Sequence, residues 1–196
     1  MNIEFGCGHR APRDGFLGCD TRQTPTTAWV CDAWDITRFV RPDSVGEIYS
    51  RHFFEHLTFA QGLRTLRAWH RILRGGGKVT LITPDLQWHC DQFLNNRAEY
   101  ASTRGLPETG IFGWQRETEE SECFSALDTS WDVHKSGYDF ITLRKAIVHC
   151  GFVGTARVSG DPRYDSDHPK HLHVEFFKPS APPVTAAPHD AVPERR

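Results

Sequence analysis

The stretch IEFGCGHRAPRDGFLGCD, residues 3–20, decides the fold. It contains two short apolar runs that are typical of β-strands, and the glycine pair Gly6 and Gly8 closes the first of them. An acid, Asp20, closes the second run, and a third run further on ends in Asp32. Because the carboxyl ends of parallel strands meet at one edge of a sheet, these residues predict a ligand site at that edge.

The glycine pair belongs to the pattern G-x-G-x-x-G/A at residues 6–11. A dinucleotide site needs a helix after these glycines and an acid about 20 residues further on. Here Asp20 follows Gly8 by twelve residues, and Pro12 interrupts the interval. A pyrophosphate relies on that helix N-terminus, so the short interval disfavours NAD and FAD and leaves S-adenosylmethionine open. A tight turn that closes a strand without binding a ligand is the alternative.

The rest of the chain alternates between strand and helix patterns. Apolar periodicity predicts further strands at 47–51, 78–83, 153–159 and 171–177, and helices at 58–74, 85–100 and 140–150. The last two strands have no helix between them and should be antiparallel. The sequence therefore predicts an α/β fold, a Rossmann-like mostly parallel sheet with an antiparallel last strand and helices on both faces.

The length of 196 residues fits one domain, which we place at residues 1–178. Residues 102–137 are rich in Gly, Glu and Ser with weak periodicity, so we expect an insertion or lid there. Residues 179–196 are rich in Pro and Ala and are expected to form a disordered tail.

The composition indicates which kinds of binding partner and which compartment to expect. The net charge of −2 argues against a nucleic-acid partner, and no apolar run is long enough to cross a membrane. The N-terminus lacks a signal-peptide pattern, and the six cysteines form no C-x-x-C pair. We therefore expect reduced thiols and a cytoplasmic protein, whose oligomeric state the sequence leaves open.

Four motifs, read together, point to a known family: IEFGCGHR with FLGCD, VCDAWDI, EIYSRHFFEHL, and HRILRGGGKVTLITPDL. With them the chain resembles class I S-adenosylmethionine-dependent methyltransferases, specifically small, type 11-like ones with a shortened first crossover. The resemblance is close over residues 1–95 and loose over residues 131–177. It implies S-adenosyl-L-methionine as the cofactor and methyl transfer to an oxygen or nitrogen of a small molecule or sugar.

The resemblance also implies roles for individual residues. The backbone of Gly6 and Gly8 would hold the methionine part of the cofactor, with Phe5 and Cys7 beside them. The remaining cofactor-binding residues would be Asp20 at the ribose hydroxyls, Asp32 at the adenine amino group, the Ala33 backbone beside the ring, and His52 at the methyl-transfer end. The chain departs from the family where Arg10 and Ala11 replace a third glycine, and where Gly75 replaces a proline.

A hydroxyl acceptor would need a base, whereas an amine acceptor needs less help. His52, Asp85 and His134 are the candidate catalytic residues, because they fall at predicted strand ends or in the lid, and because histidine titrates near neutrality.

Two other functions stay open. His52-Phe53-Phe54-Glu55-His56 matches H-x-x-E-H, in which two histidines on one helix face bind zinc and the glutamate acts as the base. His52 follows a predicted strand, however, so we expect no metal, and we interpret the cluster His168, His171 and His173 as surface histidines. The alternatives are thus a zinc-dependent hydrolase and a non-catalytic cofactor-binding module.

Overall fold

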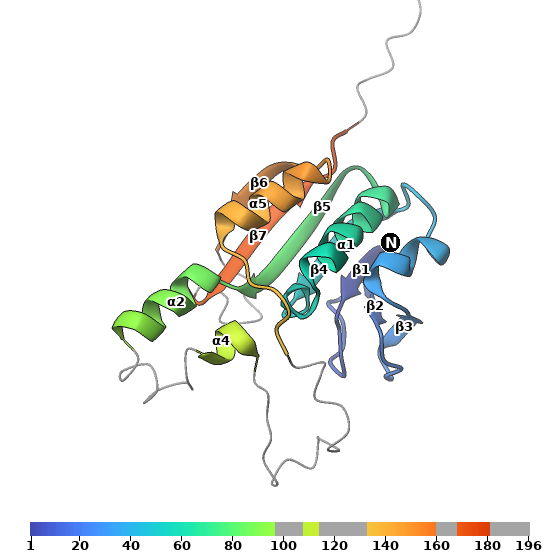
Figure 1. Ribbon diagram of the computed structural model, residues 1–196. Helices are drawn as coiled ribbons and strands as arrows, with labels where there is room; N and C mark the ends of the chain where they lie inside the picture. The colour runs from blue at the N-terminus through green and yellow to red at the C-terminus, as the bar shows by residue number, and fades with distance from the viewer. Residues whose placement is uncertain (97–107, 114–132, 160–167, 181–196) are drawn as a thin grey trace, which may run out of the picture.

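A seven-stranded mixed sheet forms the centre of the molecule in the computed structural model, which describes residues 1–96, 108–113, 133–159 and 168–180 (Figure 1). The strand order is β3-β2-β1-β4-β5-β7-β6. Strands β1 to β5 are parallel, and β7 runs antiparallel to both of its neighbours. The predicted Rossmann-like sheet is confirmed. The strands are β1 (Asn2–Phe5), β2 (Phe16–Asp20), β3 (Thr27–Val30), β4 (Val45–Arg51), β5 (Leu73–Pro84), β6 (Val153–Arg157) and β7 (His171–Phe177).

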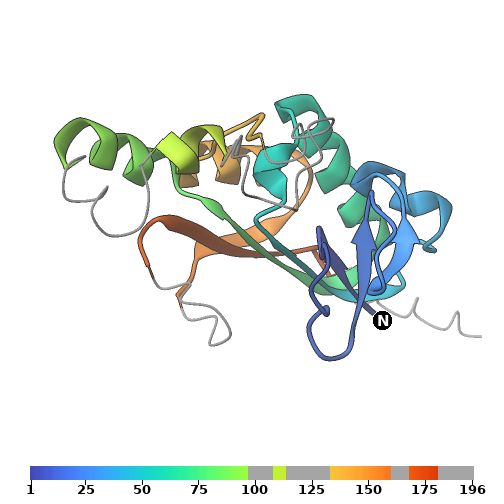
Figure 2. The same cartoon turned by 90° about the horizontal axis from the view of Figure 1, so that it is seen from below.

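The described helices cover one face of the sheet, as Figure 2 shows, whereas the sequence predicted helices on both faces. The reason is the length of two connections: residues 6–15 and 21–26 join β1 to β2 and β2 to β3 without a helix. On the other face, the Arg13 guanidinium lies 4.4 Å from the ring centroid of Tyr49. The helices are η1 (Ala33–Arg38), η2 (Phe54–His56), α1 (Phe59–Ile72), α2 (Leu86–Asn95), α4 (Glu108–Phe112) and α5 (Phe140–His149).

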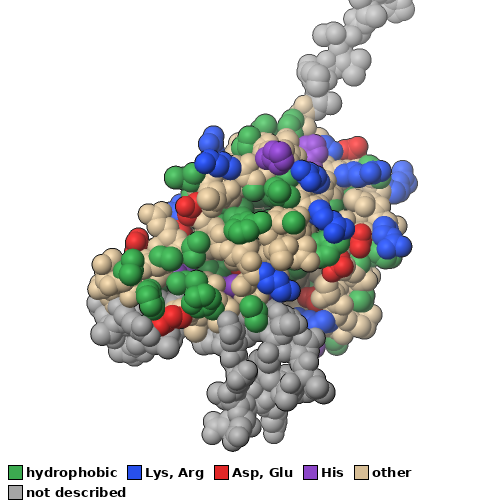
Figure 3. All heavy atoms as spheres, in the orientation of Figure 1, with side chains coloured by type: hydrophobic (Ala, Val, Ile, Leu, Met, Phe, Trp, Pro, Cys, Tyr) green, Lys and Arg blue, Asp and Glu red, His purple; other side chains and the backbone are tan. Residues whose placement is uncertain are grey.

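The boundaries of α1 explain one difference from the prediction. Thr58 and Gln61 form a capping box at its N-terminus, as the sequence pattern suggests. The helix ends at Ile72, before the glycines at 75–77, because Leu73 is extended and already pairs with Val45 of β4. The glycines therefore lie within β5 and do not end the helix. In Figure 3, most of the Lys and Arg side chains on the visible face lie on the side of the molecule where α1 and η1 lie.

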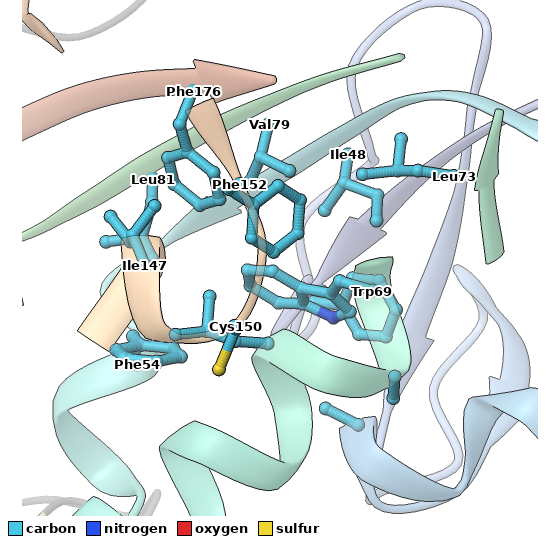
Figure 4. Packing of buried hydrophobic residues seen from close by; sticks show 14 of the residues in the cluster. Ile48, Phe54, Trp69, Leu73, Val79, Leu81, Ile147, Cys150, Phe152 and Phe176 are labelled. Carbon is cyan, nitrogen blue, oxygen red and sulfur yellow. The ribbon is translucent and has the colours of Figure 1, made fainter. Parts of the chain in front are cut away.

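The core lies between the sheet and the helices α1 and α5, with Trp69 at its centre (Figure 4). Trp69 is fully buried, and its ring centroid lies 5.1 Å from that of Phe5 and 6.0 Å from that of Phe54. Under α5, the rings of Phe152 and Phe176 pack edge to face at 4.8 Å. This packing fixes the carboxyl ends of β1 and β4, because Phe5 is the last residue of β1 and Phe54 follows β4 closely.

The structure describes two parts of the predicted insertion, residues 108–113 and 133–137. The helix α4 packs on α2, and Gly113 forms an antiparallel bridge with Val133. Residues 102–107 and 114–132 of the predicted insertion, and all but two residues of the expected tail at 179–196, lie outside the described residues. Among the described residues, no helix has the length and apolarity to span a membrane.

Candidate functional site

A cavity of about 630 Å³ lies at the carboxyl ends of β1, β4 and β5. Three segments supply its main lining: the glycine loop at residues 6–8, the residues that follow β4, and His134 with α4. This is the edge at which the sequence predicted a ligand site. A volume of this size is typical of pockets that hold a small molecule or cofactor.

The glycine loop turns sharply away from β1. Gly6 and Gly8 have φ angles of +71° and +58°, which L-residues with side chains rarely adopt. A Cβ on Gly6 would lie 2.5 Å from Cβ of Phe53, so no side chain fits there. The absent side chains leave backbone atoms of the loop as one wall of the cavity. Gly6, Cys7 and Gly8 all line it, and their binding of a cofactor stays a prediction.

Asp20 holds this loop in place through a hydrogen bond to its backbone. Its Oδ2 accepts a hydrogen bond from the Gly8 backbone N–H at 2.9 Å, and its Oδ1 accepts from the backbone N–H and Nε of Arg22 at 3.0 and 3.3 Å. The carboxylate is 8% exposed and is not part of the cavity lining, whereas Arg22 is. Two carboxylate oxygens offer about four acceptor positions, so about one of them stays unused.

Three other residues predicted to bind the cofactor lie outside the cavity lining. Asp32 is exposed at the N-cap of η1, where its side chain makes no capping bond, and Ala33 is buried at the start of that helix. Phe5 is buried in the core. None of these three lines the cavity, and of the predicted cofactor set only Gly6, Cys7, Gly8 and His52 do.

A histidine and a buried acid face each other where β4 ends. His52 has a φ of +48°, and its Nδ1 lies 3.3 Å from Oε1 of Glu55. Glu55 is 1% exposed, and its Oε2 accepts a hydrogen bond from the Thr83 hydroxyl at 3.1 Å. Burial opposes ionisation of Glu55, but the contact with His52 and the nearby His56 outweighs it, so the pKa of Glu55 lies below its ordinary value.

His171 completes this side of the cavity. Its ring centroid lies 4.9 Å from that of His52, and burial together with the charge of His52 lowers the pKa of His171 to about 3. The interpretation of the cluster at 168–173 as surface histidines is wrong for two members: His173 is 5% exposed and His171 lines the cavity. The signal for His171 was present in the topology. Strand β7 runs antiparallel to β5, so β7 begins at the edge of the sheet where β5 ends. His171, the first residue of β7, is therefore paired with Pro84, the last residue of β5.

The other two candidate bases have different surroundings. His134 lines the cavity with its Nδ1 3.1 Å from the carbonyl oxygen of Gly110, and burial lowers its pKa. Asp85 is not in the lining. Its carboxylate caps α2 by accepting from the backbone N–H groups of Gln87 and Trp88, and it pairs with Arg157. These bonds give Asp85 a structural task, and its role as a base stays a prediction.

The H-x-x-E-H pattern does not form the helix that the zinc-peptidase arrangement requires. His52 directly follows β4, and residues 54–56 form a single 3-10 turn. Among the described residues, one group could hold a metal ion, and it consists of Glu55, His56 and His134 without His52. In that set the glutamate is a ligand, so the arrangement with Glu55 as the free base is not present.

No family model matches the sequence, and no curated protein matches it. Many solved structures match the fold. A SAM-dependent methyltransferase from Archaeoglobus fulgidus aligns with a TM-score of 0.53 at 11% identity, over 90% of this chain and 85% of that one. Another, from Methanosarcina mazei, aligns with a TM-score of 0.53 at 10% identity, over 92% of both chains.

A third match comes from a complex between the Trm112 methyltransferase activator and a methyltransferase of Haloferax volcanii. It has a TM-score of 0.53 at 15% identity and covers 92% of this chain and 82% of that one. At such identities the likeness concerns the fold alone. The chain has the fold of class I SAM-dependent methyltransferases.

Proposed function

We propose that this protein binds S-adenosyl-L-methionine in the cavity beside Gly6–Gly8 and transfers its methyl group to an oxygen or nitrogen of a small molecule or sugar. The observation that carries the proposal is the cavity itself. It lies at the carboxyl edge of a methyltransferase-like sheet and joins a side-chain-free glycine wall to a group of histidines.

The residues present fit this cofactor. Gly6 and Gly8 line the cavity and carry no side chain, so a ligand there can meet their backbone atoms. Asp20 would serve the ribose hydroxyls if Arg22 released Oδ1, and Arg22 lies at the cavity with a side chain 42% exposed. Asp32 and Ala33 would complete the set around the adenosine, and Phe5 would lie beside the glycines.

When bound, the cofactor supplies an electrophilic methyl group on a positively charged sulfur. The task of the protein is then mainly to align the acceptor with that methyl group at about 3–3.5 Å. His52 is the residue we expect to accept a proton from a hydroxyl acceptor. Glu55 orients its ring through Nδ1, which leaves Nε2 as the proton acceptor.

Calorimetric titration with S-adenosylhomocysteine tests the proposal. We expect the wild type to bind with a Kd in the micromolar range, about −8 kcal/mol. The variant Asp20→Ala should bind at least about tenfold more weakly, because it frees the Gly8 N–H and removes the ribose acceptor. Asp14→Ala is the matched control, since Asp14 is an exposed acid of the connection between β1 and β2 and does not line the cavity, so the affinity should stay unchanged.

Zinc content measured on the same sample separates the alternatives. The absence of binding by the wild type at millimolar ligand would contradict the proposal. Stoichiometric zinc in such a sample would favour the hydrolase, and neither ligand nor zinc would leave a non-catalytic module.

A further inference from the structure

We infer that Glu55, His56 and His134 form a binding site for one divalent transition-metal ion. Each residue offers one ligand atom, and these three atoms lie within 4.8 Å of one another. Ligands that share an ion at bond lengths of about 2.0–2.2 Å must be about 3–4 Å apart. Only a small contraction is therefore needed.

Each of the two histidines has one ring nitrogen next to a backbone carbonyl oxygen, as metal-binding histidines usually do. Nδ1 of His56 lies 3.2 Å from the carbonyl oxygen of Val133, and Nδ1 of His134 lies 3.1 Å from that of Gly110. A carbonyl oxygen only accepts, so each Nδ1 carries the proton and each Nε2 keeps its lone pair. A ligand histidine typically has its second ring nitrogen bound in this way, because the contact fixes both tautomer and ring orientation. The two rings meet edge to face with their centroids 5.1 Å apart.

The acid is also held in place. Glu55 is almost fully buried, and Thr83 and His52 each contact one of its carboxylate oxygens. A carboxylate has about four acceptor positions, so about two stay available to an ion. A buried carboxylate between histidines that are neutral as ligands gains from a neighbouring cation, because burial penalises its uncompensated charge.

Backbone hydrogen bonds join the two segments that supply the ligands. The N–H groups of Lys135 and Ser136 donate to the carbonyl oxygen of Glu55 at 2.8 and 3.1 Å. The N–H of His134 donates to the carbonyl oxygen of Phe112 in α4 at 3.1 Å. Residues far apart in the sequence are thereby fixed in one place, and an ion would find its donors already assembled.

Two imidazoles and one carboxylate suit Zn²⁺, Mn²⁺ or Fe²⁺ better than Mg²⁺, which prefers oxygen ligands alone. Three protein ligands leave coordination positions open, and all three residues line the cavity. The role of the open positions rests on the proposed function. An oxygen atom of the methyl acceptor would occupy an open coordination position of the ion. The acceptor would then be an oxygen nucleophile, such as a hydroxyl beside a second oxygen donor, and the ion would lower the pKa of that hydroxyl.

The test is calorimetric titration of chelator-treated protein with ZnCl₂ and with MnCl₂. We expect the wild type to bind one ion of at least one of the two metals per chain. His56→Ala and His134→Ala should each weaken this binding by about 10- to 100-fold or more. His149→Ala is the matched control, since His149 is an exposed histidine at the end of α5 and should leave the affinity unchanged.

Titration with S-adenosylhomocysteine on the same samples keeps the two proposals apart. If S-adenosylhomocysteine binds but neither Zn²⁺ nor Mn²⁺ binds at one ion per chain, the metal site is overturned and the proposed function stands. Metal binding equal in wild type, His56→Ala and His134→Ala would also overturn it. Metal binding lost in these two variants, whose melting temperatures stay near that of the wild type, supports the site even if the cofactor analogue does not bind. If His56→Ala fails to fold, His134→Ala decides the outcome, because His134 lies on a loop.

Discussion

The glycine loop allows a prediction with a magnitude worked from the structure. Gly6→Ala places a Cβ at a φ of +71°, which costs about 1–2 kcal/mol for an L-residue. The new Cβ would also lie 2.5 Å from Cβ of Phe53, and because that atom is attached to the backbone it cannot swing away. Overpacking of this kind costs a further 1–3 kcal/mol or so. We expect a loss of about 3 kcal/mol in the free energy of unfolding.

Thermal denaturation measures this loss, with Gly15→Ala as the matched control. Gly15 has a φ of +80°, but a Cβ added there would meet nothing within 4 Å, so only the backbone penalty applies. At about 2–4 °C per kcal/mol for a chain of this size, Gly6→Ala should lower the Tm by about 6–12 °C and Gly15→Ala, with a penalty of about 1–2 kcal/mol, by about 2–8 °C. Gly6→Ala should also weaken S-adenosylhomocysteine binding, whereas Gly15→Ala should not. Equal Tm losses in the two variants would refute the argument from close approach.

Two further predictions concern stability. Thr58→Ala removes the side-chain half of the capping box at the start of α1, so we expect a loss of about 1 kcal/mol and a Tm lower by about 2–4 °C, and an unchanged Tm would show that the box contributes nothing. The pKa of His171 falls from 6.5 to about 3 in the folded protein, because of burial, His52 and the nearby cations Lys170 and Arg51. Below about pH 6.5 the unfolded chain therefore binds a proton at His171 that the folded chain does not bind. The free energy of unfolding then decreases as the pH falls from about 6.5 toward 3. The Tm difference between pH 7.5 and 5.5 should be smaller in His171→Leu than in the wild type, while His149→Leu should leave it unchanged; equal differences in all three would contradict the assignment.

The strand ends were predictable because they depend on local signals. Gly6, Asp20 and Asp32 each follow a short apolar run, and in a parallel sheet such ends meet at one edge. The absence of a helix after the glycine pair was predictable too, since twelve residues with a proline leave no room for one. That the described helices would then all lie on one face of the sheet is a property of the whole topology, which no single motif carries.

The composition of the site was harder to predict because it depends on long-range contacts. The pattern H-x-x-E-H suggested that His52 and His56 act together, but the positive φ of His52 separates it from the turn that carries His56. The partner of Glu55 and His56 is instead His134, which lies 78 positions after His56. No periodicity links such positions, and they meet through long-range contacts, among them the backbone bonds to Glu55 and the contact of His56 with the Val133 carbonyl oxygen.

Asp85 and Asp20 show a second limit of predicting a site from sequence. Both acids follow strands, and sequence position alone does not distinguish an acid that faces a ligand from one that satisfies backbone N–H groups. Asp85 caps α2 and pairs with Arg157, while Asp20 holds the N–H of Gly8. Such capping is what short acids at strand and helix ends commonly do.

The central claim is that the cavity beside Gly6–Gly8 holds S-adenosylmethionine. A crystal structure of the protein grown with saturating S-adenosylhomocysteine tests it most directly. The account predicts ligand density against the glycine loop, with the ribose near Asp20 and the sulfur toward His52. Density at any other place, or an empty cavity at saturating ligand, would contradict it.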